Sequence, residues 1–439
     1  MRACIVGAGS SGIAAAKELR SKSVAFDCIE ASDRVGGNWV YQNKNGMSAC
    51  YAGLNINTSR TRMEYPGFPM PKQYPDFPHH SQIAAYFDSY VDHYGIRDAI
   101  QFETKVERIT KDGSQFVVTT SRGTTRYDAV LVANGHHWDP RWPDPAIPGS
   151  LDGVVMHAHA YETPDIFAGK HVVVLGMGNS AMDIAVESSY VAASTTLCSR
   201  RGAWVIPKYI FGRPLDTIVT DARIPFRIRR KIAESLVSLA VGDLTRYGLP
   251  APDHRIGSAH PTISGRILDR FGHGAITYRP MIEKLEGDHV RFVDGSRVRC
   301  DVLVYCTGYK VTFPFFDAGF VQAKDNDLPL FRRVFHPDIA GLFFVGLLQP
   351  LGAIMPLAQA QGEWIADYLV GRYALPDEAA MRRDIEHERA EMFERYVASP
   401  RHTMQVDYDD YLYALAIERR LGEKRAKLGR SSIGPSSAA

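Results

Sequence analysis

The stretch that decides the fold lies near the start of the chain and reads ACIVGAGSSGIAAAKELR, residues 3–20. Its first four residues are apolar and predict a buried strand, whereas the Ala-rich part after Ser10 predicts a helix. Between them stands a Gly-x-Gly-x-x-Gly loop. In such a loop the first glycine makes a tight turn, the second lets the backbone approach a pyrophosphate, and the third lets the helix pack on the strand. The spacing predicts a dinucleotide-binding loop formed by Gly7, Gly9 and Gly12.

An acidic residue follows the next predicted strand. Glu30 comes directly after the run AFDCI, residues 25–29. A carboxylate at this place can bond the hydroxyls of a ribose. Strand, glycine loop, helix and acid therefore occur in the order that a dinucleotide-binding fold requires.

A second copy of this pattern begins with HVVVLGMGNSA, residues 171–181. Its third glycine is replaced by the small residue Ala181, which such loops allow. The strand that follows this copy ends in Arg200 and Arg201 rather than in an acid. Guanidinium groups favour a 2′-phosphate, which an acid would repel, so the second copy suits NADPH and the first does not. A hydride must pass between two ring systems, so two such folds are most simply explained by a flavin in the first and NADPH in the second.

Composition narrows the classes of partner. The chain has 439 residues, of which 45% are hydrophobic and 23% charged, with a formal net charge of +2. So small a charge provides no field for nucleic acid or anionic lipid, and we expect neither as a partner. The six cysteines show no C-x-x-C pair and no metal-ligand spacing, so we expect no metal site. A strand by residue 3 leaves no room for a secretory signal, and prolines interrupt the apolar stretch 341–360, so we expect a cytoplasmic protein.

One motif resembles a known family. The pattern F-x-G-x-x-x-H-x-x-x-[YF] identifies flavin-containing monooxygenases, and residues 151–161 (LDGVVMHAHAY) match it except that Leu151 replaces the opening Phe. Other segments are similar to the same family, and the resemblance covers nearly the whole chain. They are the GGNW motif at 36–39, the Asn-containing loop 51–71, VYCTGY at 304–309, and the segment 346–362 that in the family returns over the flavin.

The resemblance implies a fold of two Rossmann-like domains. Apolar runs alternate with helix-length stretches, as an α/β protein with parallel sheets requires, and residues 104–127 alternate apolar and polar residues as hairpins do. A C-terminal helical segment is expected from the charged amphipathic pattern over 377–427, followed by a disordered tail. The predicted boundaries are 1–155 and 295–375 for the FAD domain, 156–294 for an inserted NADPH domain, and 376–439 for the helices and tail.

The resemblance also implies the chemistry. NADPH reduces FAD, the reduced flavin takes O2 to form a C4a-hydroperoxide, and this species oxygenates an amine nitrogen or a sulfide sulfur of a small molecule. Asn57 is the one catalytic side chain implied, as a donor to the peroxide or to the NADP+ ribose, although a turn-forming asparagine is the alternative. The residues expected to contact the cofactors are Gly7, Gly9, Ser11, Gly12, Glu30, Gly37, Asn38, Trp39, Asn57, Thr58, Gly176, Gly178, Asn179, Ser180, Asp183, Arg200 and Arg201.

The sequence leaves other reactions and other residue roles open. Related Baeyer–Villiger enzymes usually have Trp where Tyr161 ends the pattern, so Tyr161 favours heteroatom oxygenation over ketone oxidation. A redox sensor that binds FAD and NADPH without oxygenating anything is the other alternative. His157 is interpreted as a structural residue, and the basic run 223–231 as a solvated helix face rather than a patch that contacts a cofactor or a membrane. A homodimer is expected only because it is the commonest assembly.

Overall fold

The structure is a computed structural model that describes residues 1–218, 224, 226–396 and 403–429. The chain forms two compact units. The first unit contains residues 1–48, 58–139 and 310–439, and the second contains residues 49–57 and 140–309. Each unit contains a five-stranded sheet whose described pairings are all parallel, so the expected α/β class is confirmed.

The sheet of the first unit has the strand order β23-β7-β1-β2-β3. Its central strands are buried on both faces, which is why they read as continuous apolar runs rather than as alternating ones. The strands are β1 (Arg2–Val6), β2 (Ala25–Ile29), β3 (Ile100–Gln101), β7 (Ala129–Val132) and β23 (Leu342–Phe344).

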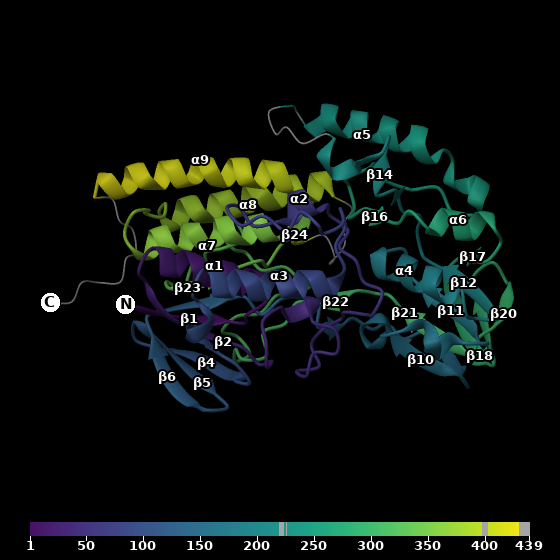
Figure 1. Ribbon diagram of the computed structural model, residues 1–439, viewed down its shortest axis with the longest axis horizontal. Helices are drawn as coiled ribbons and strands as arrows, with labels where there is room; N and C mark the ends of the chain where they lie inside the picture. Colours follow the sequence, from purple (N-terminus) through teal and green to yellow (C-terminus); the bar gives the residue numbers. More distant parts are fainter. Residues whose placement is uncertain (219–223, 225, 397–402, 430–439) are drawn as a thin grey trace. The chain divides into compact units, whose positions relative to one another are not determined.

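Two helices that are far apart in the sequence pack together in this unit. Figure 1 shows α1 (Ser10–Ser21) and α7 (Met355–Leu369) side by side. A Cβ atom on Gly362 of α7 would lie 2.9 Å from the Cα of Ala15 of α1, so this close approach requires the glycine. Helices α2 (Arg60–Met63) and α3 (His80–His93) belong to the same unit.

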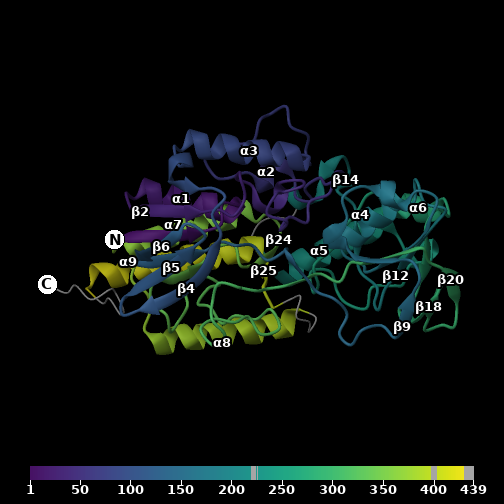
Figure 2. The same ribbon diagram turned by 90° about the horizontal axis from the view of Figure 1, so that it is seen from below.

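The predicted hairpins over 104–127 form a three-stranded antiparallel sheet, seen in Figure 2. The strands are β4 (Val106–Asp112), β5 (Gln115–Thr120) and β6 (Gly123–Tyr127). Their apolar side chains, among them those of Ile109 and Phe116, join a core with Cys4 and Val130 of the parallel sheet. The hairpins therefore pack against one face of that parallel sheet.

The two predicted C-terminal helices are α8 (Glu378–Arg395) and α9 (Tyr408–Lys427), with short strands β24 (Gln349–Leu351) and β25 (Gln405–Asp407) beside them. They belong to the first compact unit, whereas we predicted a separate segment from residue 376. The tail 430–439 that we expected to be disordered lies outside the described residues.

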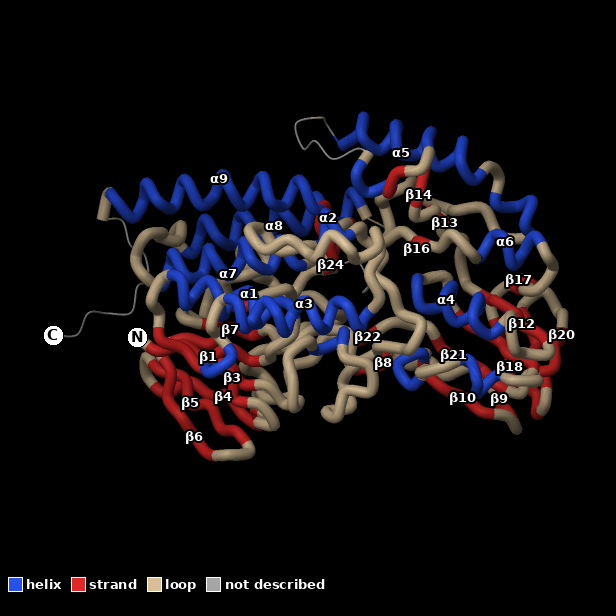
Figure 3. Tube along the Cα trace, in the orientation of Figure 1, coloured by secondary structure: helices blue, strands red, loops and turns tan. Residues whose placement is uncertain are grey.

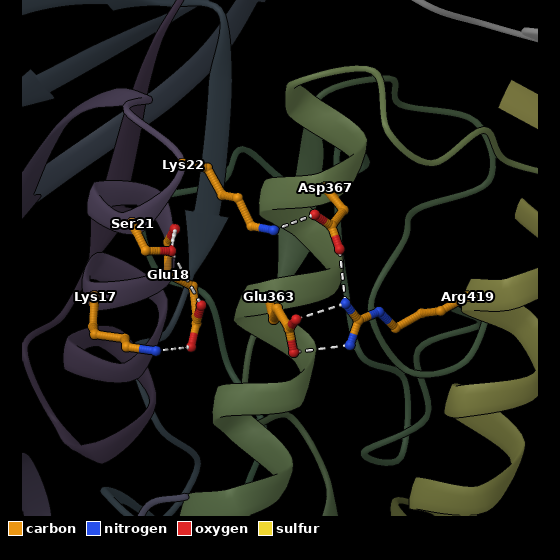
Figure 4. Close-up of polar contacts among 7 residues, drawn as sticks. All are labelled: Lys17, Glu18, Ser21, Lys22, Glu363, Asp367 and Arg419. Carbon is orange, nitrogen blue, oxygen red and sulfur yellow. Dashed lines mark hydrogen bonds and ion pairs between the residues drawn. The ribbon is translucent and has the colours of Figure 1, made fainter. Parts of the chain in front are cut away.

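An ion network attaches the last helix to the first, as Figure 4 shows. The Arg419 guanidinium of α9 bonds Glu363 at 2.8 Å and Asp367 at 2.7 Å, both on α7. The Lys22 ammonium, just after α1, bonds the other oxygen of Asp367 at 2.7 Å. Burial alone would raise the pKa of Asp367, but the bonds from Lys22 and Arg419 outweigh it and hold that pKa below its usual value. Loss of one partner would leave a charge poorly compensated among these three elements.

The sheet of the second unit has the order β10-β21-β11-β12-β17. Helix α4 (Asn179–Ser188) packs on one face, and a second sheet of order β20-β19-β18-β9 packs on the other. Figure 3 shows these strands in red together in this unit. The strands are β9 (Gly149–Leu151), β10 (Val154–His157), β11 (His171–Leu175), β12 (Ser194–Cys198), β17 (Thr277–Arg279), β18 (Ile282–Gly287), β19 (His289–Phe292), β20 (Arg297–Arg299) and β21 (Val302–Tyr305).

The described part of residues 202–276 in this unit is less regular. They contain the short strands β13 (Val205–Ile206), β14 (Tyr209–Ile210), β15 (Arg213–Pro214) and β16 (Thr262–Ile263) and the helices α5 (Phe226–Val241) and α6 (Ile267–Gly272). Of the basic run 223–231, positions 223 and 225 lie outside the described residues. Arg227 and Lys231 of α5 are exposed, as a solvated face requires, but Arg229 is buried.

The compact units differ from the boundaries that we predicted from the sequence. The larger segment of the second unit runs from Pro140 to Tyr309. It includes β10 and β21, which pair with each other, and β11, which pairs with β21. The second unit also includes residues 49–57, which we had placed in the first domain. Among the described residues, no helix has the length and apolar character needed to span a membrane.

Candidate functional site

The first glycine loop has one glycine that its own packing does not require. A Cβ atom on Gly7 would lie 2.7 Å from the carbonyl oxygen of Ala133, and one on Gly12 would lie 1.8 Å from the carbonyl oxygen of Gly7. A Cβ atom on Gly9 would meet nothing nearer than the Cα of Gly37, at 3.7 Å. Gly9 precedes α1, whose N-terminal N–H groups attract an anion. The loop therefore fits a pyrophosphate that approaches the backbone at Gly9.

Glu30 lies at the end of β2 as predicted, and it is 5% exposed. One carboxylate oxygen accepts the backbone N–H of Ala8 at 2.7 Å, and the other accepts that of Ser32 at 2.7 Å. Burial raises the pKa of Glu30, and these backbone donors oppose the rise. Each carboxylate oxygen has a second lone pair, so the group can also accept a ribose hydroxyl.

The GGNW motif lies against the same loop. The N–H of Gly36 donates to the carbonyl of Ala8 at 3.1 Å, and a Cβ atom on Gly37 would lie 3.1 Å from the Cα of Gly9. Asn38 and Trp39 are half-buried in the short 3-10 helix Gly37–Trp39. The motif is therefore next to the predicted pyrophosphate position.

Sequence reasoning missed Asn43, which ties this region together. Its amide oxygen accepts the Ser32 hydroxyl at 2.6 Å, and its amide nitrogen donates to the carbonyl of Gly37 at 3.2 Å. Asn43 thus connects the turn after Glu30 to the GGNW motif. No spacing rule in the sequence points to it.

The segment 346–362 returns to the start of α1. A Cβ atom on Gly346 would lie 2.0 Å from the hydroxyl oxygen of Ser11, so only glycine fits there. The N–H of Gly346 donates to the side-chain oxygen of the fully buried Gln361 at 2.8 Å. Thr58 is buried, and its hydroxyl lies 3.5 Å from the carbonyl oxygen of Gly352. The first unit therefore brings Ser11 and Thr58 to this returning segment.

The second glycine loop is built like the first. Gly176 has a φ of +145°, and a Cβ atom there would lie 2.7 Å from the carbonyl oxygen of Cys306. Gly178 precedes α4, whose first residues are Asn179 and Ser180. The Asn179 side-chain oxygen accepts the N–H of Ile263 at 2.7 Å, so this side chain has a structural partner within the unit.

The two arginines after β12 have different surroundings. The Arg201 guanidinium bonds Asp253 at 2.8 Å, and both side chains are largely exposed. Arg200 is exposed, and within the part of the chain that the structure describes its guanidinium has no ion-pair or hydrogen-bond partner. The Ser199 hydroxyl donates to the carbonyl of Arg201 at 2.9 Å and fixes this turn. Arg200 is therefore the freer of the two for a phosphate.

A third arginine near this turn was not found from the sequence. Arg279 ends the edge strand β17 and pairs in register with Cys198, two residues before Arg200. Its Nε is buried and has no hydrogen-bond partner among the described residues. The preceding Tyr278 hydroxyl lies 3.1 Å from that of Ser199. Strand register, which the sequence does not display, brings Arg279 to this edge of the sheet.

Asp183, which we expect to contact a cofactor, has a hydrogen-bond partner within the second unit. The Tyr51 hydroxyl donates to its carboxylate at 2.5 Å, and burial raises the pKa of Asp183. One turn further along α4, the Tyr161 hydroxyl donates to Glu187. Asn57, six residues after Tyr51, is half-buried at the end of the segment 49–57.

His157 is 3% exposed, and its Nδ1 accepts the N–H of His159 at 3.0 Å. Its ring lies 5.7 Å from that of Trp142 and 5.4 Å from that of Tyr309, measured between centroids. Burial lowers the pKa of His157 to about 4, so the ring is neutral near pH 7. This packing supports the interpretation of His157 as a structural residue.

The chain is similar to known proteins over most of its length. Residues 1–424 match the model of the family described as flavin-binding monooxygenase-like. Flavin-containing monooxygenase 5 of Rattus norvegicus is 35% identical over 439 aligned residues, covering 94% of this chain and 82% of the relative. Dimethylaniline monooxygenase [N-oxide-forming] 2 of Pan troglodytes is 31% identical over 441 residues, covering 95% of this chain and 82% of the relative.

The fold is similar to solved structures as well. The S-allyl-L-cysteine S-oxygenase of Allium sativum aligns with a TM-score of 0.72 and 26% identity, covering 98% of this chain and 92% of that structure.

Proposed function

The chain belongs to the flavin-binding monooxygenase-like family, and we propose that it uses NADPH and O2 to oxygenate an amine nitrogen or a sulfide sulfur of a small molecule. It is an oxidoreductase with FAD and NADPH as cofactors. The observation that carries the assignment of each cofactor is the charge next to each glycine loop. Glu30 directly follows the strand beside the first loop, whereas Arg200 and Arg201 come shortly after the strand beside the second.

The two sites fit their cofactors by different means. In the first unit the uncrowded face of Gly9 and the carboxylate of Glu30 suit the pyrophosphate and ribose of FAD. In the second unit Arg200 supplies a guanidinium that no described residue neutralises, which suits the 2′-phosphate of NADPH. Arg279 adds a further cation, on the strand next to β12.

The two cofactors supply the redox chemistry when bound, since FAD accepts the hydride of NADPH and activates O2. The chain's own residues bind and orient them and need no strong acid or base. We assign to Asn57 a neutral donor role in oxygen transfer, because an amide donates hydrogen bonds without adding charge.

Two observations support an amine nitrogen or a sulfide sulfur as the atom that is oxygenated. One relative is named as forming N-oxides and one similar structure as an S-oxygenase. In addition, Tyr161 stands where related ketone-oxidising enzymes usually have Trp, and its hydroxyl donates to Glu187. Ketone oxidation is thereby the less favoured reaction.

The test uses purified protein loaded with FAD. NADPH oxidation and O2 uptake are followed with N,N-dimethylaniline, S-allyl-L-cysteine and cyclohexanone in separate reactions. We expect the amount of N-oxide or sulfoxide formed to be nearly equal to the amount of NADPH consumed. Lactone from cyclohexanone as the main product would contradict the substrate class, and a lack of any oxygenated product would favour a redox sensor.

A further inference from the structure

The segment 49–57 interrupts the sequence of the first unit but belongs to the second. Polar contacts with residues of the second unit hold it there. The Tyr51 hydroxyl donates to Asp183 at 2.5 Å, the N–H of Ala52 donates to the carbonyl of Glu162 at 2.9 Å, and the Lys208 ammonium donates to the carbonyl of Ile56 at 3.0 Å. The last of these carbonyls belongs to the peptide that leads directly into Asn57.

Packing restricts the segment further. Tyr51 is 5% exposed and lies in the apolar cluster that covers α4, with its ring 5.6 Å from that of Tyr161. A Cβ atom on Gly53 would lie 2.1 Å from a carboxylate oxygen of Glu187, so Gly53 packs against the end of this side chain of α4. The segment therefore packs against side chains that α4 carries or contacts.

Helix α4, which carries Asp183 and Glu187, begins at the second glycine loop. Asp183 lies in the first turns of α4, which begins at Asn179 directly after Gly178. A bond from Tyr51 to Asp183 thus ties the segment to the same rigid element that presents its N-terminus to the nucleotide.

We propose that Tyr51 and Lys208 are positioning residues that fix Asn57 relative to the NADPH loop of the second unit. This inference rests on the role proposed for Asn57 in oxygen transfer. The position of Asn57 is then determined by the unit assigned to NADPH, although the residues on either side of segment 49–57 in the sequence belong to the unit assigned to FAD.

The test compares the variants Y51F and K208M with the parent enzyme, and all three proteins are loaded with FAD. Each variant removes one polar anchor and retains most of the apolar side chain. Hydrogen exchange of the peptide covering residues 49–57, measured with and without NADP+, reports the anchoring itself. Loss of a hydrogen bond to a charged group predicts roughly 10- to 100-fold faster exchange for Y51F.

Activity separates positioning from a general structural role. We expect flavin reduction by NADPH to stay within about threefold of the parent, because the nucleotide loop is unaltered, while product formed per NADPH falls. D183N keeps an oxygen that accepts the Tyr51 hydroxyl, so it should retain more coupling than D183A. Y190F, which alters a tyrosine that is 59% exposed just after α4, is the matched control and should leave both measurements unchanged.

The outcomes are distinguishable. Unchanged exchange and unchanged coupling in Y51F and K208M, together with an uncoupled N57A enzyme, would overturn the positioning role and leave the proposed function intact. Full coupling in N57A would overturn the role of Asn57 itself. Equal loss of flavin reduction and coupling would show that the anchors only stabilise the fold. If Y51F does not fold, K208M and D183N decide the question.

Discussion

The carboxylate of Glu30 accepts the backbone N–H of Ala8 at 2.7 Å, so the acid that ends β2 is bonded to the glycine loop that precedes α1. We expect E30Q to weaken FAD binding, because an amide nitrogen would replace one of two oxygens that accept backbone N–H groups. Loss of one charge-assisted bond corresponds to roughly 10- to 100-fold weaker binding. Titration of the apoprotein with FAD measures the effect.

The matched control for this variant is D33N. Asp33 belongs to the same turn but pairs with Arg34 at 2.9 Å and Lys44 at 2.7 Å at the surface. Its loss should leave FAD affinity within about twofold, since exposed pairs contribute little. Equal weakening in both variants would show that Glu30 has no special part in the cofactor site.

Gly9 and Gly12 of the first loop should respond differently to alanine. G9A should fold, because its Cβ atom would meet only the Cα of Gly37 at 3.7 Å, but it should purify without FAD because the methyl group occupies the pyrophosphate approach. G12A should fail to fold or lose much stability, because its Cβ atom would lie 1.8 Å from the carbonyl oxygen of Gly7. Circular dichroism and the ratio of flavin to protein separate the two. A folded G9A protein with a full complement of FAD would contradict the location of the site.

The parts of the site that the sequence predicted are those whose chemistry is local. A glycine loop and the acid or arginine at the next strand end lie within about 30 residues of one another, and strand, turn and helix rules connect them. The positions of Gly7, Gly12 and Glu30 follow directly from those rules, and the structure places them together.

The parts that the sequence did not predict depend on pairing between distant segments. Tyr51 and Asp183 are 132 positions apart, and no local pattern indicates that they meet. The same is true of the ion pair between Arg201 and Asp253 and of the register that places Arg279 beside Cys198. The second unit includes the chain from Pro140, whereas we predicted the inserted domain from residue 156. The pairing of β10 with β21, which no local pattern indicates, joins this stretch to the second unit.

The arginines after β12 should differ in their effect on nucleotide choice. We expect R200A to weaken NADP+ roughly 10- to 100-fold and to leave NAD+ nearly unchanged, because its guanidinium has no partner among the residues described. R201A should have a smaller effect, because Arg201 already bonds Asp253 at 2.8 Å. Titrations with 2′,5′-ADP and with 5′-AMP isolate the phosphate. Equal losses for both ligands in R200A would contradict the assignment.

His157 should make the stability of the protein depend on pH. Burial lowers its pKa from 6.5 to about 4, so between these values the unfolded chain binds more protons than the folded one. Stability is therefore lost as the pH falls from about 6.5 towards 4, by up to about 3 kcal/mol from this group. H157N keeps an acceptor for the N–H of His159 but does not titrate, so its unfolding free energy should vary less over this range. Denaturant unfolding at several pH values measures the difference.

A surface histidine provides the control for this measurement. H289N removes a histidine that lies beside Asp288 at the edge of β19. The pH dependence of this variant should follow that of the parent much more closely than that of H157N. A parallel change in both variants would show that His157 is not responsible for the lost stability.

Asn57 should matter for oxygen transfer but not for hydride transfer. Hydride transfer requires only that the nicotinamide and the flavin be stacked correctly, whereas oxygen transfer also requires well-placed donors and the exclusion of water. N57A should therefore reduce its flavin with NADPH at a rate within a few-fold of the parent but form far less product. The lost amide contact is worth about 1–3 kcal/mol, which corresponds to roughly 5- to 150-fold. N57D should be affected more severely, because it adds a negative charge where a neutral donor is required. The electrons of NADPH that do not form product should appear as hydrogen peroxide, which is measured together with NADPH consumption. If N57A couples NADPH to product as well as the parent does, Asn57 is a turn residue and the oxygen-transfer role belongs to another part of the chain.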